Sequence, residues 1–224
     1  RNMVLQLTAE NTLNSVTNQV TYDSETGGRT TMPVNMNGNW EAQGSFSLST
    51  PFKNKNWLVR TYSQLRFSNK NGYTTLNKEE PQKSSVRHLT ARERLNLTYR
   101  TKQIEIGARG SVVYNNSYNN VKSIRTETFD YQAGMNVQCY LPWGFEVYSD
   151  AVWNLRSGYG QNEGNDYLMW NAQLSKSFFK RKQLLLRFKI YDILQQENAL
   201  TRTITATSIR DTCLLYTSPS PRDT

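Results

Sequence analysis

Charged side chains recur at alternate positions in several segments of this chain, where they share a predicted face with other polar residues. Charges on such a face tune the selectivity of a water-filled passage, or contact a plug or a solute. The other reading is a set of cross-strand ion pairs that only satisfies a wet interior. Glu41 and Glu105 belong to the same faces. The residues that we consider candidates for lining an interior are Arg60, Arg66, Arg92, Arg94, Arg109, Asp130, Glu146, Asp150, Arg156, Arg187 and Lys189.

Groups suited to catalysis or metal binding are few. His88 is the single histidine, and it shares its predicted face with Thr90 and Arg92. A Ser-His-Asp site needs a serine and an acid around the histidine, and a metal site needs further ligands at suitable spacing; the sequence indicates neither. The glycine-rich stretch 158–164 lacks the spacing of a phosphate-binding loop, and no helical pattern follows it. We therefore expect no enzyme activity, no cofactor and no metal site.

The elements that must position these charges are long strands. From Phe145 to Arg156, mainly apolar residues at odd positions alternate with mainly polar residues at even positions. A period of two over ten or more residues describes a strand whose two faces meet unlike surroundings. The pattern recurs along most of the chain and predicts lipid outside and water inside. We expect an all-β fold, an antiparallel up-and-down transmembrane β-barrel of which about ten long strands are present.

The connections between the expected strands alternate in length. Short turns are predicted at 53–56, 100–103, 142–144 and 180–182, with longer polar loops between them, as in outer-membrane barrels. Aromatic residues gather near strand ends, which suits girdles at two membrane interfaces, although the core of a sandwich would also use them. The expected strands are 3–22, 29–52, 57–70, 84–100, 103–118, 124–141, 145–158, 166–179, 183–192 and 201–211.

Composition narrows the function classes. The 224 residues carry a formal net charge of +9, but Lys and Arg are scattered among Asp and Glu rather than gathered into a basic stripe. This distribution argues against a nucleic-acid partner. No apolar run approaches the roughly 18 residues of a membrane-spanning helix, and the mean hydropathy is -0.71. A membrane protein of this composition has to cross with strands.

The two ends of the chain are unusual. When residues 213–224 are back-translated, they resemble read-through into a sequencing adaptor, so we expect Cys213–Thr224 to be a non-native, disordered tail. The chain begins at Arg1 rather than Met, and we expect it to be a fragment that is open at both ends. The expected organisation is one partial barrel domain over 1–212. Without the tail only Cys139 remains, which excludes a disulfide framework.

The C-terminal half carries a family resemblance. Residues 170–178, the stretch Phe188–Leu194 and the end at 200–212 resemble the outer-membrane β-barrel family of Bacteroidota, relatives of TonB-dependent receptors. Residues 35–40 resemble another segment of that family, and the resemblance spans most of 29–212. Family members usually end in one more strand that closes on an aromatic residue. The plug domain and the TonB-contacting box would lie upstream of Arg1, so no ligand or coupling residue is carried over.

The resemblance implies a function and a location. It implies binding and import of a solute across the outer membrane of a Gram-negative bacterium, with outer-membrane lipid as a partner and the TonB system contacted through an upstream region. Two alternatives stay open. One is a passive porin or structural barrel, and the other is a secreted soluble β-protein that binds carbohydrate.

Overall fold

The computed structural model describes residues 1–23, 25–52, 55–76, 80–121, 123–159, 166–179, 183–196, 199–204 and 209–214. These residues form strands joined by turns, with one short 3-10 helix, η1 (Pro142–Gly144). The strands are β1 (Asn2–Thr12), β2 (Ser15–Tyr22), β3 (Arg29–Met36), β4 (Asn39–Pro51), β5 (Trp57–Leu76), β6 (Gln82–Arg100), β7 (Ile104–Asn119), β8 (Ile124–Tyr140), β9 (Phe145–Ser157), β10 (Asp166–Phe178), β11 (Leu184–Ile190), β12 (Ala199–Ile204) and β13 (Ile209–Leu214).

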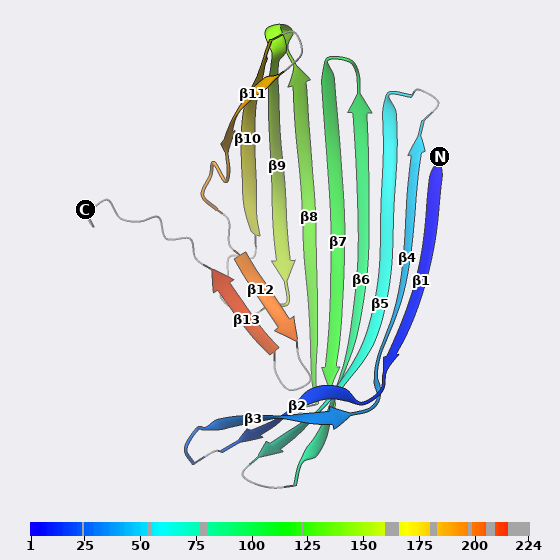
Figure 1. Ribbon diagram of the computed structural model, residues 1–224, viewed down its shortest axis with the longest axis vertical. Helices are drawn as coiled ribbons and strands as arrows, with labels where there is room; N and C mark the ends of the chain where they lie inside the picture. Colours follow the sequence, from blue (N-terminus) through cyan, green and yellow to red (C-terminus); the bar gives the residue numbers. More distant parts are fainter. Residues whose placement is uncertain are drawn as a thin grey trace, which may run out of the picture.

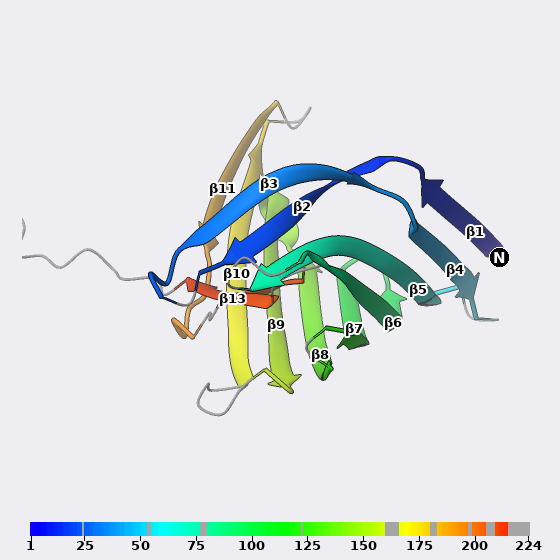
Figure 2. The ribbon, with the colours of Figure 1, turned by 90° about the horizontal axis from the view of Figure 1, so that it is seen from below.

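Eleven strands form one curved sheet (Figure 1). Its main path runs β1-β4-β5-β6-β7-β8-β9-β10-β11, and each neighbouring pair on this path is antiparallel. Seen along the strands in Figure 2, the sheet follows an arc. The expected all-β antiparallel fold is thus confirmed. The sheet is not closed into a barrel, because β1 and β11 stand at its two edges without a further neighbour on the path.

Tight turns join the long strands at one rim. The Thr101 N–H donates to the Ile104 carbonyl (2.8 Å), and the Leu141 N–H donates to the Phe145 carbonyl (2.9 Å). The predicted turns at 100–103 and 142–144 are therefore confirmed, and both lie at the upper rim in Figure 1. The turn predicted at 180–182 and part of that at 53–56 lie outside the described residues. We call this rim the turn rim and the opposite one the loop rim.

Two of the long predicted strands are each divided in two by a residue with left-handed backbone. The expected strand 3–22 breaks at Asn14 (φ 50°) and the expected strand 29–52 breaks at Gly38 (φ 92°), because a left-handed residue cannot continue a strand. The paired ends β2 and β3 consequently turn away across the loop rim, and β2 also runs parallel to the end of β5. Thr17 donates its hydroxyl to the Asn71 carbonyl (2.9 Å) at this junction. The parallel contact is an exception to the otherwise antiparallel sheet.

The expected strand 201–211 is a hairpin of β12 and β13. Cys213 and Leu214, placed in the expected disordered tail, lie in β13 opposite Leu200 and Ala199. The expectation of disorder is therefore wrong for these two residues. β-branched Ile209 and Thr212 favour extended backbone, and a partner strand is close in sequence. Residues 215–224 lie outside the described residues.

Burial is reversed relative to a soluble domain. Among the described residues, only Val20, Met36, Val86 and Val152 are buried apolar residues. Eight polar residues are buried, namely Ser68, Asn71, Thr75, Ser84, Ser117, Thr128, Asn154 and Ser175. Large apolar side chains are instead exposed along most strands, Leu95 by 52% and Trp153 by 44%. No described helix is long and apolar enough to cross a membrane.

The exposed apolar face carries aromatic contacts at two levels. Near the turn rim the rings of Trp57 and Tyr99 lie 4.8 Å apart, and Lys176 lies 4.2 Å from the centre of the Phe145 ring. Toward the loop rim the centroid distances are 5.3 Å for Trp40–Phe67 and 4.8 Å for Tyr114–Phe129. We call these two sets the aromatic belts and the face that carries them the outer face.

Candidate functional site

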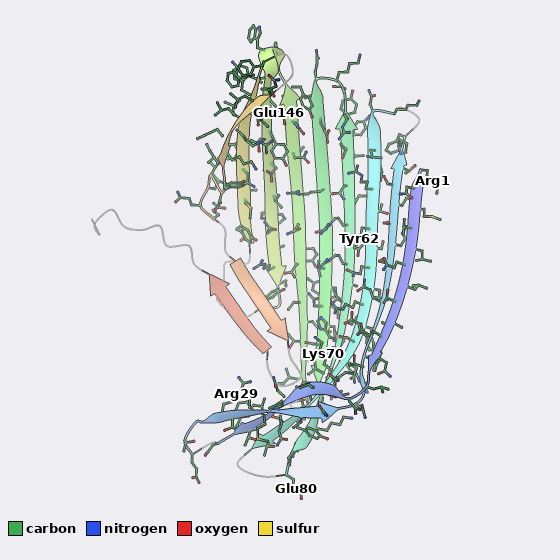
Figure 3. All side chains as sticks on the ribbon, in the orientation of Figure 1. Arg1, Arg29, Tyr62, Lys70, Glu80 and Glu146 are labelled. Carbon is green, nitrogen blue, oxygen red and sulfur yellow. The ribbon has the colours of Figure 1, made fainter. Side chains whose placement is uncertain are left out.

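The opposite face of the sheet, which we call the inner face, holds all eleven candidate residues. The registers place Arg109 opposite Gly134, and Gly134 opposite Val152. Because side chains alternate along each strand, the pairings assign every candidate to this one side. They come from β5 (Arg60, Arg66), β6 (Arg92, Arg94), β7 (Arg109), β8 (Asp130), β9 (Glu146, Asp150, Arg156) and β11 (Arg187, Lys189). Figure 3 shows Glu146 near the turn rim and Lys70 near the loop rim.

Arg109 and Asp150 meet although a whole strand separates them. Arg109 Nη2 of β7 lies 3.5 Å from Asp150 Oδ2 of β9, and the Asp150 side chain is only 12% exposed. Gly134 of β8 makes this possible. A Cβ on Gly134 would lie 3.1 Å from Arg109 Nε and 3.0 Å from the Ala151 carbonyl. The missing side chain lets the guanidinium cross β8, and the sheet must curve toward this face to bring the two strands close.

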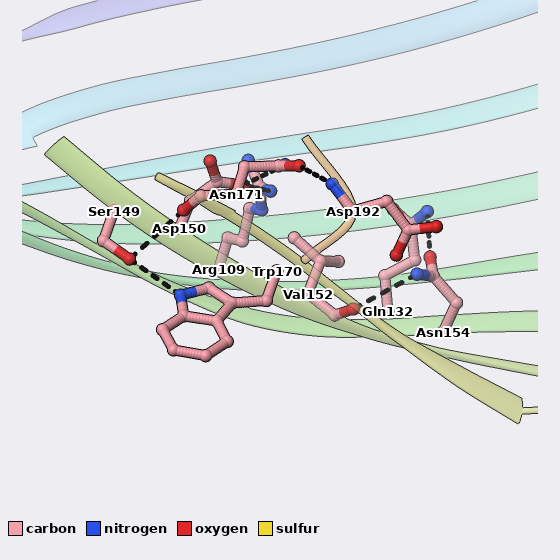
Figure 4. A network of polar contacts seen from close by, with 9 residues as sticks. All are labelled: Arg109, Gln132, Ser149, Asp150, Val152, Asn154, Trp170, Asn171 and Asp192. Carbon is pink, nitrogen blue, oxygen red and sulfur yellow. Dashed lines mark hydrogen bonds and ion pairs between the residues drawn. The ribbon is translucent and has the colours of Figure 1, made fainter. Parts of the chain in front are cut away.

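Amide side chains extend this contact sideways (Figure 4). Asn171 Nδ2 donates to Asp150 Oδ2 (3.4 Å), and Asn171 Oδ1 accepts the backbone N–H of Asp192 (2.9 Å). One row toward the loop rim, Gln132 Nε2 donates to Asn154 Oδ1 (2.8 Å). Hydrogen-bonded amides satisfy the polar groups of a crowded inner wall. This part of the inner face therefore matches the ion-pair interpretation rather than an open binding surface.

A second acidic residue is held by a tyrosine. The Tyr159 hydroxyl donates to Asp130 Oδ2 (2.9 Å), and Arg156 Nε lies 3.9 Å from Asp130 Oδ1. Burial raises the pKa of Tyr159 above its ordinary value, and nearby Asp130 acts in the same direction. A neutral phenol at this point remains a hydrogen-bond donor at neutral pH.

Other candidates have fewer partners. Glu146 accepts from Gln138 Nε2 (2.7 Å). Arg60, Arg94 and Arg187 form no ion pair among the described residues, and Lys189 lies 5.8 Å from the ring centre of Tyr191. These side chains share the inner face, but the structure does not gather them into one site.

A cavity on the inner face is lined by three basic side chains, Arg66, Lys70 and Arg92. Its volume is about 370 Å³. We call it the basic pocket, and its lining comes from β5, β6, β7, β8 and the segment after β9. The lining residues are Arg66, Ser68, Lys70, Val86, His88, Arg92, Val113, Asn115, Thr128, Asp130 and Tyr159. Three of our candidates, Arg66, Arg92 and Asp130, therefore converge here.

Sequence reasoning missed two important members of the pocket. Lys70 continues the alternation of Arg66 and Ser68 along β5, so the spacing could have placed it on the inner face. Tyr159 lies in a predicted loop, and nothing in its local pattern indicates that it turns back onto Asp130. His88, which the sequence left without a role, is half-buried in the pocket wall, where its Nε2 lies 3.0 Å from the Thr90 hydroxyl.

The described residues show no group of three or more His, Cys, Asp and Glu side chains that could hold a metal ion. The basic pocket presents guanidinium, ammonium, amide and hydroxyl groups. Comparisons with known proteins give no match, whether with family models, with curated proteins or with solved structures.

Proposed function

We propose that this chain forms part of the wall of an outer-membrane β-barrel, with its outer face against lipid and its inner face toward a water-filled interior. The observation that carries the proposal is the reversed burial of the sheet. Soluble proteins seldom expose apolar patches larger than a few hundred Å². Here apolar side chains are exposed on strand after strand, while serine, threonine and asparagine residues are buried. A bilayer is the solvent in which this arrangement is favourable.

The spacing of the aromatic belts supports the same proposal. Ten residue positions separate Trp57 of one belt from Phe67 of the other on β5. At about 3.3 Å per residue and a strand tilt of about 40°, this span corresponds to roughly 25 Å along the membrane normal. Barrel proteins have an apolar band of about 25 Å between their aromatic girdles. Lys176 beside Phe145 is a cation suited to the headgroup level.

Two polar side chains of the outer face, Trp170 and Ser149, find hydrogen-bond partners within the sheet. Trp170 Nε1 donates to the Ser149 hydroxyl (2.9 Å), and that hydroxyl donates to the Asn171 carbonyl (3.2 Å). Such pairing suits surroundings that offer no water. The unpaired edges of β1 and β11 need further strands for the same reason, and we propose that such strands close the barrel.

Within this proposal the barrel belongs to a receptor related to the TonB-dependent group and imports a solute. The residue patterns near the C-terminus that resemble the Bacteroidota family support this reading. A passive porin is the second candidate, because scattered lumen charges are common to both. A soluble carbohydrate-binding protein is disfavoured by the exposed apolar outer face.

The membrane proposal is tested by fractionation and heat-modifiable gel mobility of the chain expressed, in a Gram-negative host, together with the further strands that we propose close the barrel. We expect the protein in the outer-membrane fraction, folded at room temperature and shifted in mobility after boiling. Recovery as a detergent-independent soluble protein would overturn it. Solute uptake into vesicles then separates the two membrane functions: a passive pore admits solutes without any energised partner, whereas a receptor does not.

A further inference from the structure

We propose that the basic pocket binds a small hydroxylated solute through a single oxyanion group, as in a sugar acid or a sugar phosphate. The proposal deepens the proposed function, on which it rests for the route by which solute reaches the inner face. The pocket lies toward the loop rim, where Lys70 is seen in Figure 3. It is therefore placed near the end at which a barrel of this kind opens outward.

The pocket holds more positive than negative charge. Arg66, Lys70 and Arg92 face one carboxylate, Asp130, so the formal balance of the lining is 3 − 1 = +2 with His88 neutral. Arg66 is paired with Glu41 outside the lining, and Asp130 lies near Arg156. Lys70 and Arg92 have no carboxylate partner among the described residues. Two cations thus remain for a ligand.

Three buried polar atoms in the pocket wall also make no hydrogen bond. Arg92 Nε, His88 Nδ1 and Asp130 Oδ1 are inaccessible to solvent and make no hydrogen bond. A buried donor without an acceptor carries the full cost of its lost hydration. An oxyanion bound beside the guanidinium of Arg92 would supply that group with a counter-charge and with hydrogen-bond acceptors. Arginine is well suited to this role because its planar fork matches carboxylate and phosphate oxygens.

The rest of the lining suits hydroxyl groups. The neutral polar side chains Ser68, Asn115 and Thr128 line the pocket around the cationic end, and Asn115 is itself bonded to Thr90 and Thr128. A volume of about 370 Å³ is within the range of small-molecule sites, which is roughly 300–1,000 Å³. The combination of two free cations with neutral polar groups favours a small polar anion over an apolar ligand.

The test uses the folded protein in detergent micelles or outer-membrane vesicles, with binding measured by isothermal titration at low salt. The probes are glucuronate, glucose 6-phosphate and glucose, which share a ring and differ in the oxyanion. Arg92→Gln and Lys70→Gln remove one cation each. Arg94→Gln is the matched control, because Arg94 lies on the same strand and face, two residues from Arg92, but does not line the pocket.

We expect at least one of the two anionic sugars to bind more than tenfold more tightly than glucose, and the two probes to show whether carboxylate or phosphate is preferred. Arg92→Gln and Lys70→Gln should each weaken that binding by about tenfold, while Arg94→Gln leaves it within about twofold. Equal binding of all three sugars, no binding of any, or equal effects of Arg92→Gln and Arg94→Gln would overturn the proposal. Membrane assembly is scored separately by gel mobility, so failure of the membrane proposal is distinguished from failure of the pocket.

Discussion

Leu95→Arg is the substitution that separates a lipid-facing sheet from a water-facing one. Leu95 lies on the outer face of β6 and is 52% exposed. Its neighbour Arg94 is exposed on the inner face and forms no ion pair among the described residues. The reciprocal variant Arg94→Leu is therefore the control, since both changes exchange leucine and arginine at adjacent exposed positions.

The magnitude follows from the depth of Leu95 between the aromatic belts. It lies four residues from Tyr99 in one belt and six from Leu89, which pairs with Phe67 of the other belt. At about 3.3 Å per residue and a tilt of about 40°, these distances are roughly 10 and 15 Å along the membrane normal, close to the midplane. An arginine on the lipid face at that depth costs about 2–4 kcal/mol, or about thirtyfold to several hundredfold in the folding equilibrium.

Reversible guanidinium unfolding in lipid vesicles measures this cost, with folded and unfolded protein resolved by gel mobility. Leu95→Arg should lose about 2–4 kcal/mol, and Arg94→Leu less than about 1 kcal/mol. If the outer face met water instead, Leu95→Arg would add a solvated charge to an exposed site and change stability by less than about 0.5 kcal/mol. Equal effects of the two variants would refute the assignment of the faces.

Three further predictions follow from individual contacts. Glu93 is an exposed acid on the outer face, in a groove lined mainly by apolar groups. Glu93→Leu should therefore stabilise the protein in vesicles by about 1–2 kcal/mol. A loss of stability in the same unfolding assay would count against a lipid contact. Gly134→Ala should cost about 1–3 kcal/mol, because its Cβ would lie 3.0 Å from the Ala151 carbonyl, whereas Gly110→Ala meets nothing closer than 4.0 Å and should cost less by thermal gel shift. Asn71→Ala removes a buried side chain that donates to the chain between β3 and β4, so hydrogen exchange should quicken in β2 and β3 but not in β8; uniform exchange rates would contradict this.

Alternation predicted the faces of the strands well, for a physical reason. A strand has a fixed period of two, so a residue's face follows from its place in the run, and pairing preserves that face across the sheet. Phe145 and Val147 thus share the outer face, and Glu146 lies on the inner one. The long antiparallel strands and the turns at 100–103 and 142–144 follow from the same local signals.

Contacts between strands could not be obtained in this way. Alternation assigns Arg109 and Asp150 to one face, but only the curvature of the sheet and the bare backbone at Gly134 bring them to 3.5 Å. Alternation alone therefore predicts that a substitution at Asp150 is tolerated. The structure instead pairs the charge of Asp150 with that of Arg109. The turn of β2 and β3 across the loop rim depends on the left-handed residue Asn14 and on a parallel contact with β5, neither of which has a periodic signature.

The most direct test of the proposal that the outer face contacts lipid is the accessibility of spin labels along β8 in bilayers. Labels are placed one at a time from 131 to 138, omitting Gly134, in a variant without Cys139 and Cys213, and relaxation by oxygen is compared with relaxation by a water-soluble nickel chelate. We predict high oxygen accessibility at the odd-numbered, outer-face positions and low oxygen accessibility at the even-numbered, inner-face positions, because oxygen concentrates in the hydrocarbon. A nickel signal that is highest at the outer-face positions, or no alternation at all, would contradict the proposal that this face meets lipid.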